Sequence, residues 1–94
     1  MPTAYVFMNT EIGSESIVLE ALKKIEEVEE AHALWGVYDI IASVKTDTIN
    51  KLVSVITKKI ENIKKINAKL TMIITESPMT KTHQEAVLLE TPTV

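Results

Sequence analysis

The chain has 94 residues, a formal net charge of −3 at pH 7 and 46% hydrophobic residues. This length predicts one compact domain with a single core, and the composition is that of a globular protein. The absence of cysteine excludes a disulfide framework and thiol chemistry. No apolar run reaches the roughly 20 residues of a membrane-spanning helix, and the first residues, MPTAYVFMNT, lack the features of a signal peptide. We therefore expect a soluble, cytoplasmic protein without contact to membranes.

The basic residues argue against direct binding of nucleic acid. All 10 of them are lysines, and arginine is absent, although arginine forks supply much of the bidentate recognition of phosphates and bases. The lysine-rich stretch from Lys58 to Lys65 fits the solvated face of an amphipathic helix better than a phosphate-binding surface.

The first third of the chain predicts a strand followed by a helix. Residues 3–10 are apolar on both alternating faces, which is typical of a strand covered on both sides. Gly13 then breaks the strand, and Ser14 is the expected N-cap of a helix of about three turns. The apolar stripe of that helix consists of Ile17, Val18, Ala21, Leu22 and Ile25.

The remaining elements are two strands, a helix and a last strand. Residues 28–35 predict a strand that turns at Gly36, and residues 38–45 predict the next, with Ile40, Ala42 and Val44 on one face. Asp47 or Thr48 is expected to cap the second helix. Its apolar stripe is Ile49, Leu52, Val53, Ile56, Ile60 and Ile63. The β-branched residues 66–75 predict the last strand.

The order β-α-β-β-α-β is that of the ferredoxin-like α+β fold, a four-stranded antiparallel sheet with both helices on one face. The other face is then bare, although the first and last strands carry apolar residues on both faces. A bare apolar face of this size favours packing against a second copy about a two-fold axis, so we expect a homodimer. We assign residues 1–76 to this domain. Residues 77–94 form a tail with a short helix between Lys81 and Glu90, either a loose segment or an arm on a partner subunit.

Catalytic motifs are missing from the sequence. It has no glycine-rich phosphate loop, no metal-ligand spacing and no nucleophile motif, and His32 and His83 stand alone. We therefore expect no enzyme activity, metal or cofactor. Asp39 has two interpretations: it accepts hydrogen bonds from amides of the turn 36–38, which its position favours, or it binds the ammonium group of a ligand.

A set of residues in this order resembles the Lrp/AsnC effector-binding domain, also called the RAM domain (regulation of amino-acid metabolism). The resemblance covers about residues 3–76, and its most specific part is the Gly-x-Tyr-Asp turn between two strands. The matching residues are Val28, Ala31, His32, Gly36, Tyr38, Asp39, Ile40, Asp47, Leu52 and Thr71.

The resemblance implies dimers formed through the sheets, dimers joined into octameric rings, and amino-acid effectors bound where dimers meet. Backbone groups of Gly36 and Val37 would hold one end of the amino acid, since glycine permits close approach. Tyr38 would supply a wall or fix the register, Asp39 would pair with the ammonium group or with amides of the turn, and Thr71 would offer its hydroxyl. Full-length members carry a helix-turn-helix ahead of this module. This sequence therefore resembles a stand-alone module that assembles with itself or with full-length regulators.

Two residues depart from the family pattern. Trp35 stands where a small residue usually precedes the glycine, so its ring would narrow the pocket, fill it or stack on an unusual effector. Lys65 stands where a glycine usually precedes the last strand, which predicts a different approach turn. Two alternatives follow the sensing module in rank. The first is an assembly-only interaction protein whose pocket Trp35 plugs. The second is a small dimeric α+β-barrel enzyme in which His32 and Trp35 are the active groups.

Overall fold

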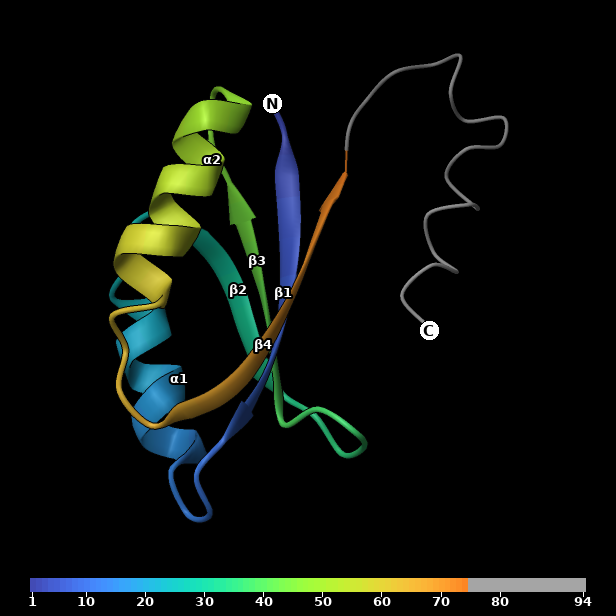
Figure 1. The fold of residues 1–94 in the computed structure, drawn as a ribbon, viewed down its shortest axis with the longest axis vertical. Helices are drawn as coiled ribbons and strands as arrows, with labels where there is room; N and C mark the ends of the chain where they lie inside the picture. The colour runs from blue at the N-terminus through green and yellow to red at the C-terminus, as the bar shows by residue number, and fades with distance from the viewer. Residues whose placement is uncertain (75–94) are drawn as a thin grey trace.

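A computed structural model describes residues 1–74, and these form one layer of strands and one layer of helices (Figure 1). The elements in chain order are β1 (Thr3–Thr10), α1 (Glu15–Lys23), β2 (Val28–Ala33), β3 (Ile40–Lys45), α2 (Ile49–Val55), the π-helical segment η1 (Ile56–Ile60) and β4 (Ile66–Ile74). The predictions for residues 77–94 and for His83 lie outside the described residues.

The four strands form one sheet in the order β2-β3-β1-β4, and every neighbouring pair is antiparallel. Both helices lie on the same side of this sheet (Figure 1). The predicted ferredoxin-like α+β fold is therefore confirmed. Residues that face each other across strands share a face, so Val6 lies between Ala42 and Thr71 on the helix side of the sheet.

The core lies between the helices and the sheet, and it is filled by apolar side chains. The fully buried ones on the strands include Val6, Met8, Ile40 and Val44, and those on the helical side are Val18, Leu22, Leu52 and Ile60. The predicted alternation of β3 is confirmed, because its first, third and fifth residues are buried. Burying such side chains contributes on the order of 1.5–3 kcal/mol each, which makes this layer the main source of stability.

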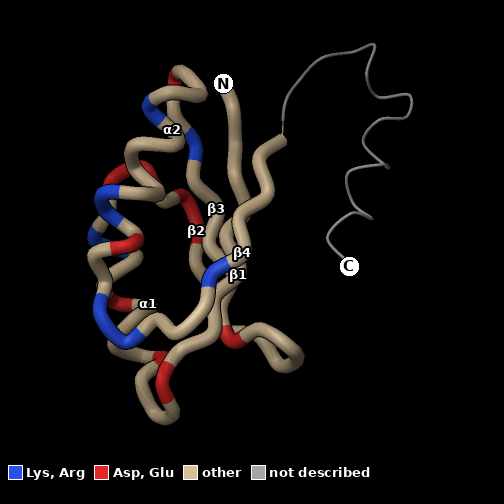
Figure 2. The backbone as a smooth tube through the Cα atoms, viewed as in Figure 1, with Lys and Arg blue, Asp and Glu red and all other residues tan. Residues whose placement is uncertain are grey.

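The helix-free side of the sheet carries the predicted apolar surface. Tyr5 of β1 and Leu70, Met72 and Ile74 of β4 are between 36% and 46% exposed, and Phe7 lies half-buried among them. Charged residues gather instead over the helices and their connections (Figure 2). We name Tyr5, Phe7, Leu70, Met72 and Ile74 the apolar face. Its packing against a second copy stays a prediction.

Several predicted boundaries were wrong. β2 ends at Ala33 rather than Trp35, and β3 begins at Ile40 rather than residue 38, because the apolar residues between them belong to a loop. Ile17 is 57% exposed instead of packing in the α1 stripe. The second helix is regular only to Val55 and continues as a π-helical segment, a shift in periodicity that a fixed helical pattern misses.

The helix starts match the sequence only in part. Gly13 has φ +81°, a conformation that favours glycine, as its role of breaker requires. Ser14 occupies the N-cap of α1, but its side chain accepts no capping hydrogen bond. Thr48, rather than Asp47, caps α2, because its Oγ1 accepts from the Lys51 amide at 3.1 Å.

The turn before β4 keeps a glycine-like backbone, although a lysine stands there. Lys65 has φ +79°, and its carbonyl accepts a hydrogen bond from the Glu11 amide at 2.9 Å. This positive φ is the conformation that a glycine adopts readily, and the expectation that the turn differs from that of the family stays a prediction. The lysine adopts the left-handed region, which costs a non-glycine residue about 1–2 kcal/mol.

Candidate functional site

The loop between β2 and β3, residues 34–39, extends away from the sheet on the side opposite the helices (Figure 1). At its tip Trp35 is 102% exposed and Val37 is 85% exposed, and Leu34 at its start is 39% exposed. A cluster of apolar side chains this open to water is uncommon unless another molecule covers it.

Asp39 fastens the base of this loop to β1. Its Oδ2 accepts a hydrogen bond from the Thr10 amide at 2.9 Å. Its own amide donates to the Met8 carbonyl at 2.9 Å, and its carbonyl accepts from the Leu34 amide at 2.8 Å. A structural role for Asp39 was favoured from the sequence, but the partner was wrong: the carboxylate binds an amide of β1 rather than amides of the turn 36–38.

Tyr38 joins the loop to the apolar face. Its ring packs against the ring of Phe7 with centroids 5.6 Å apart and an interplanar angle of 50°. Tilted ring pairs of this kind contribute about 0.5–1.5 kcal/mol beyond the area that they bury. Tyr38 is thus a wall residue of the helix-free side, next to the surface where a second copy is expected.

Gly36 is not required by the fold of the single chain. Within residues 1–74, a Cβ added there would meet no atom within 4 Å beyond its chain neighbours, and its φ lies outside the positive region. The loop therefore reverses direction without help from glycine, contrary to the role expected from the sequence. The described part of the chain therefore leaves room for a side chain at this position.

Thr71 lies away from the loop in the same chain. It faces Val6 on the helix side of the sheet, whereas Tyr38 and Phe7 pack on the opposite side. Its Oγ1 is buried and has no hydrogen-bond partner among the described residues. The structure therefore brings together Trp35 to Asp39 but not Thr71.

The geometry gives little support to the enzyme alternative. His32 is exposed and pairs with Glu30, with 3.1 Å between Nε2 and Oε1, and the space between sheet and helices is filled. Within residues 1–74 no three potential metal-ligating side chains cluster. No helix of that part of the chain is long and apolar enough to cross a membrane.

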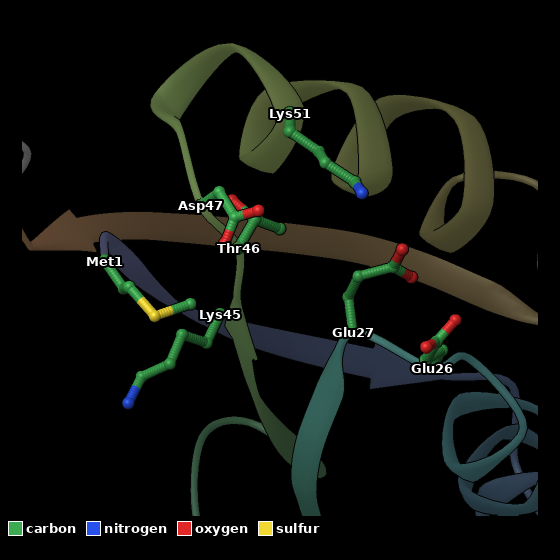
Figure 3. Close-up of a pocket in the computed structure, with 7 residues that line it drawn as sticks. All are labelled: Met1, Glu26, Glu27, Lys45, Thr46, Asp47 and Lys51. Atoms are coloured by element: carbon green, nitrogen blue, oxygen red, sulfur yellow. The ribbon is translucent and has the colours of Figure 1, made fainter.

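A charged pocket lies where the N-terminus, the end of β3 and the start of α2 meet the residues before β2 (Figure 3). Its volume of about 220 Å³ is below the roughly 300–1,000 Å³ typical of small-molecule sites. It is lined by Met1, Glu26, Glu27, Lys45, Thr46, Asp47 and Lys51. Sequence reasoning missed this group because its members are far apart in the chain.

Glu27, which lines this pocket, forms an ion pair with Lys59. Lys59 Nζ donates to its carboxylate oxygens at 3.0 and 3.3 Å, and this hydrogen bond lowers the pKa of Glu27 below its ordinary value. The ammonium of Lys51, which points toward the carboxylate (Figure 3), acts in the same direction. The pair fastens the start of β2 to η1, so we interpret it as structural.

Comparison with known proteins places the fold in a family. Residues 3–83 match the model of the Lrp/AsnC ligand-binding domain, so the chain belongs to the Lrp/AsnC family and is its ligand-binding (RAM) module. This is a family of transcription regulators, as the names of its relatives show.

Three relatives illustrate the match. A proline dehydrogenase transcriptional activator of Rhizobium radiobacter is 33% identical over 57 residues, which are 61% of this chain and 36% of that protein. The hypothetical protein PHS023 of Pyrococcus horikoshii is 38% identical with a TM-score of 0.78, over 88% of this chain and 100% of that one. AsnC of E. coli is 26% identical with a TM-score of 0.74, over 82% and 52%. The match with the curated regulator thus spans about a third of its length.

Proposed function

We propose that this chain senses a small molecule, most directly an amino acid, through the loop 34–39, and that it acts by assembling with itself or with full-length Lrp/AsnC regulators. Family membership supports a regulatory ligand-binding module. The observation that carries the proposal is the loop itself, whose apolar tip is fully exposed while its base is held by Asp39. A fixed base and an uncovered tip suit a site that a second molecule completes.

The proposed site uses each loop residue differently. The backbone at Gly36 and Val37 receives one charged end of the ligand, Tyr38 forms a wall, and Trp35 covers or stacks on the ligand. One carboxylate oxygen of Asp39 is engaged by the Thr10 amide, and the ligand ammonium would share the same carboxylate. Thr71 is on the far side of the sheet from the loop and its Oγ1 is buried, so the proposed site at the loop does not use its hydroxyl.

The proposed assembly begins with the apolar face. Two copies that pack these faces together form a dimer about a two-fold axis, and the loops 34–39 lie at its margin. Dimers then join, in the fullest form as a tetramer of dimers, and the ligand binds between them. Oligomeric assembly is general in this family of regulators, which supports self-association here.

A second candidate is an assembly-only role in which Trp35 occupies the pocket. The complete exposure of this ring in the single chain favours it, because the indole must find cover in any assembly. The two candidates differ in one respect: only the sensor gains stability from a ligand.

The experiment that tests the proposal is a thermal-shift screen of the full chain against the common amino acids at fixed protein concentration. A ligand at about 100 times its Kd stabilises by about 2.7 kcal/mol per site, and each kcal/mol shifts Tm by about 4–8 °C in a domain of this size. We expect a clear rise with one or a few amino acids. Gly36→Ala should abolish the rise without lowering Tm itself, because among residues 1–74 the added Cβ meets no atom within 4 Å beyond its chain neighbours.

Two further variants separate the candidates. A chain that ends at Glu76 should respond as the full chain does, because the proposed site lies in residues 1–76. Trp35→Ala should create a response where the wild type has none if the ring is a plug. A flat screen for both wild type and Trp35→Ala would contradict the sensor.

A further inference from the structure

The outer edge of β4, from Leu70 to Ile74, lacks the charges and prolines that usually protect the edge strand of a sheet. β4 pairs only with β1, so half of its backbone amides and carbonyls point outward without a strand partner among residues 1–74. From Leu70 to Ile74 it carries neither charge nor proline, and Ile73 is 37% exposed. Soluble proteins usually protect such edges with lysines, prolines or bulges, because an open apolar edge recruits another strand.

The other edge of the same sheet is protected. β2 carries Glu29, Glu30 and His32, and a register shift interrupts it between Val28 and Glu30. Glu29 lies 3.9 Å from Lys45 Nζ, and Glu30 lies 3.1 Å from His32 Nε2. Charge and a bulge thus block β2, whereas nothing comparable blocks β4 from residue 70 onward.

We propose that β4 pairs antiparallel with β4 of a second copy of this chain, about a two-fold axis that passes beside Met72. In this register Leu70 faces Ile74 of the partner subunit and Thr71 faces Ile73 of the partner subunit. Apolar residues therefore meet apolar or neutral ones. Lys69 lies beyond the paired residues 70–74, and its Nζ forms an ion pair with Glu61 of its own chain at 2.9 Å.

The asymmetry of the two edges supports this choice of partner. A β4 edge that bound β2 of another copy would leave a free edge at each end and would grow into a filament. The charged β2 edge prevents this growth, and β4 bound to β4 closes after two copies. The sheet then runs continuously through both subunits.

The edge contact differs from the proposed contact between apolar faces. Thr71 and Ile73 lie opposite Val6 and Ala4, whose side chains point toward the helices. They can therefore meet their counterparts only across the strand edge. The edge contact also joins the apolar faces of two copies side by side, and a second layer of subunits can still cover them.

The absence of native cysteine allows a direct test by disulfide formation. Directly opposed residues of antiparallel strands have Cα atoms about 4.5–5.5 Å apart, within the range that a disulfide spans. Full-length Thr71→Cys and Ile73→Cys chains are mixed and mildly oxidised. We expect mixed linked pairs in clear excess over links within either variant alone. Ala33→Cys, at an exposed position of the β2 edge, is the matched control and should not link.

Hydrogen exchange of the unmodified chain gives a second readout that requires no substitution. Amides of residues 70–74 should exchange more slowly as the protein concentration rises, whereas those of β2 should not change. Mixed links no more abundant than those of Ala33→Cys would overturn the proposal, and so would β4 exchange independent of concentration. Links that form only after truncation at Glu76 would also overturn it, because they would show that residues 77–94 cover this edge.

Discussion

The hydrogen bond between Asp39 and the Thr10 amide gives the sharpest prediction about the loop. Thr10 is 7% exposed, so Asp39→Ala leaves its amide buried without an acceptor. A hydrogen bond to a charged group contributes about 1.5–3 kcal/mol, and an unmatched buried amide adds to the loss. We therefore expect a loss of about 1.5–3 kcal/mol, which lowers Tm by at least about 6 °C in a domain of this size.

The assay is urea or thermal unfolding at fixed protein concentration, with two comparison variants. Asp39→Asn keeps an acceptor oxygen without the charge and should lose clearly less stability than Asp39→Ala. Asp47→Ala removes an exposed aspartate of the same chain and should change stability by less than about 0.5 kcal/mol. Equal stability of Asp39→Ala and Asp47→Ala would show that the hydrogen bond between Asp39 and the Thr10 amide does not stabilise the protein. It would also refute the idea that this bond fixes the base of the loop.

Three further changes test the structure elsewhere. Lys65→Gly should raise stability by up to about 1 kcal/mol in unfolding experiments, because φ is +79° there, whereas Lys64→Gly should lower it by about 0.4–1 kcal/mol through the greater entropy of the unfolded chain. The reverse order would refute the left-handed turn. Thr48→Ala should cost about 1 kcal/mol through loss of the α2 cap; no change in unfolding would contradict the cap. Because the pKa of Glu27 is lowered by Lys59, this pair should stabilise the fold at neutral pH and cease to do so as pH falls through the folded pKa of Glu27. Lys59→Met should weaken that acid dependence in urea titrations, and an unchanged dependence would contradict it.

The order of elements and the faces of the strands could be predicted from the sequence, because both follow from local periodicity. The alternation of Ile40, Ala42 and Val44 fixes which side of β3 meets the helices. The apolar residues on both sides of β1 and β4 likewise identified the apolar face. Such patterns involve residues only a few positions apart, so a single sequence is enough to detect them.

Contacts between distant residues could not be predicted in the same way. Asp39 and Thr10 are 29 residues apart, and Lys59 and Glu27 are 32 apart, so neither pair leaves a local signal. Trp35 continues the apolar alternation of Ala31 and Ala33, although β2 ends at Ala33, which is why the strand was predicted too long. The sequence also could not show that position 36 has room for a side chain, because this depends on which residues surround it in the folded chain.

The proposed function depends most on whether the loop binds a small molecule, and calorimetric titration of the full chain tests this directly. Wild type and Gly36→Ala are titrated with each amino acid that raises Tm in the screen, at equal protein concentration. We predict saturable binding to the wild type and none to Gly36→Ala, with the same Tm for both proteins without ligand. Equal binding to both proteins would show that the ligand binds elsewhere than at the loop. No binding to either protein would leave assembly as the function of this chain.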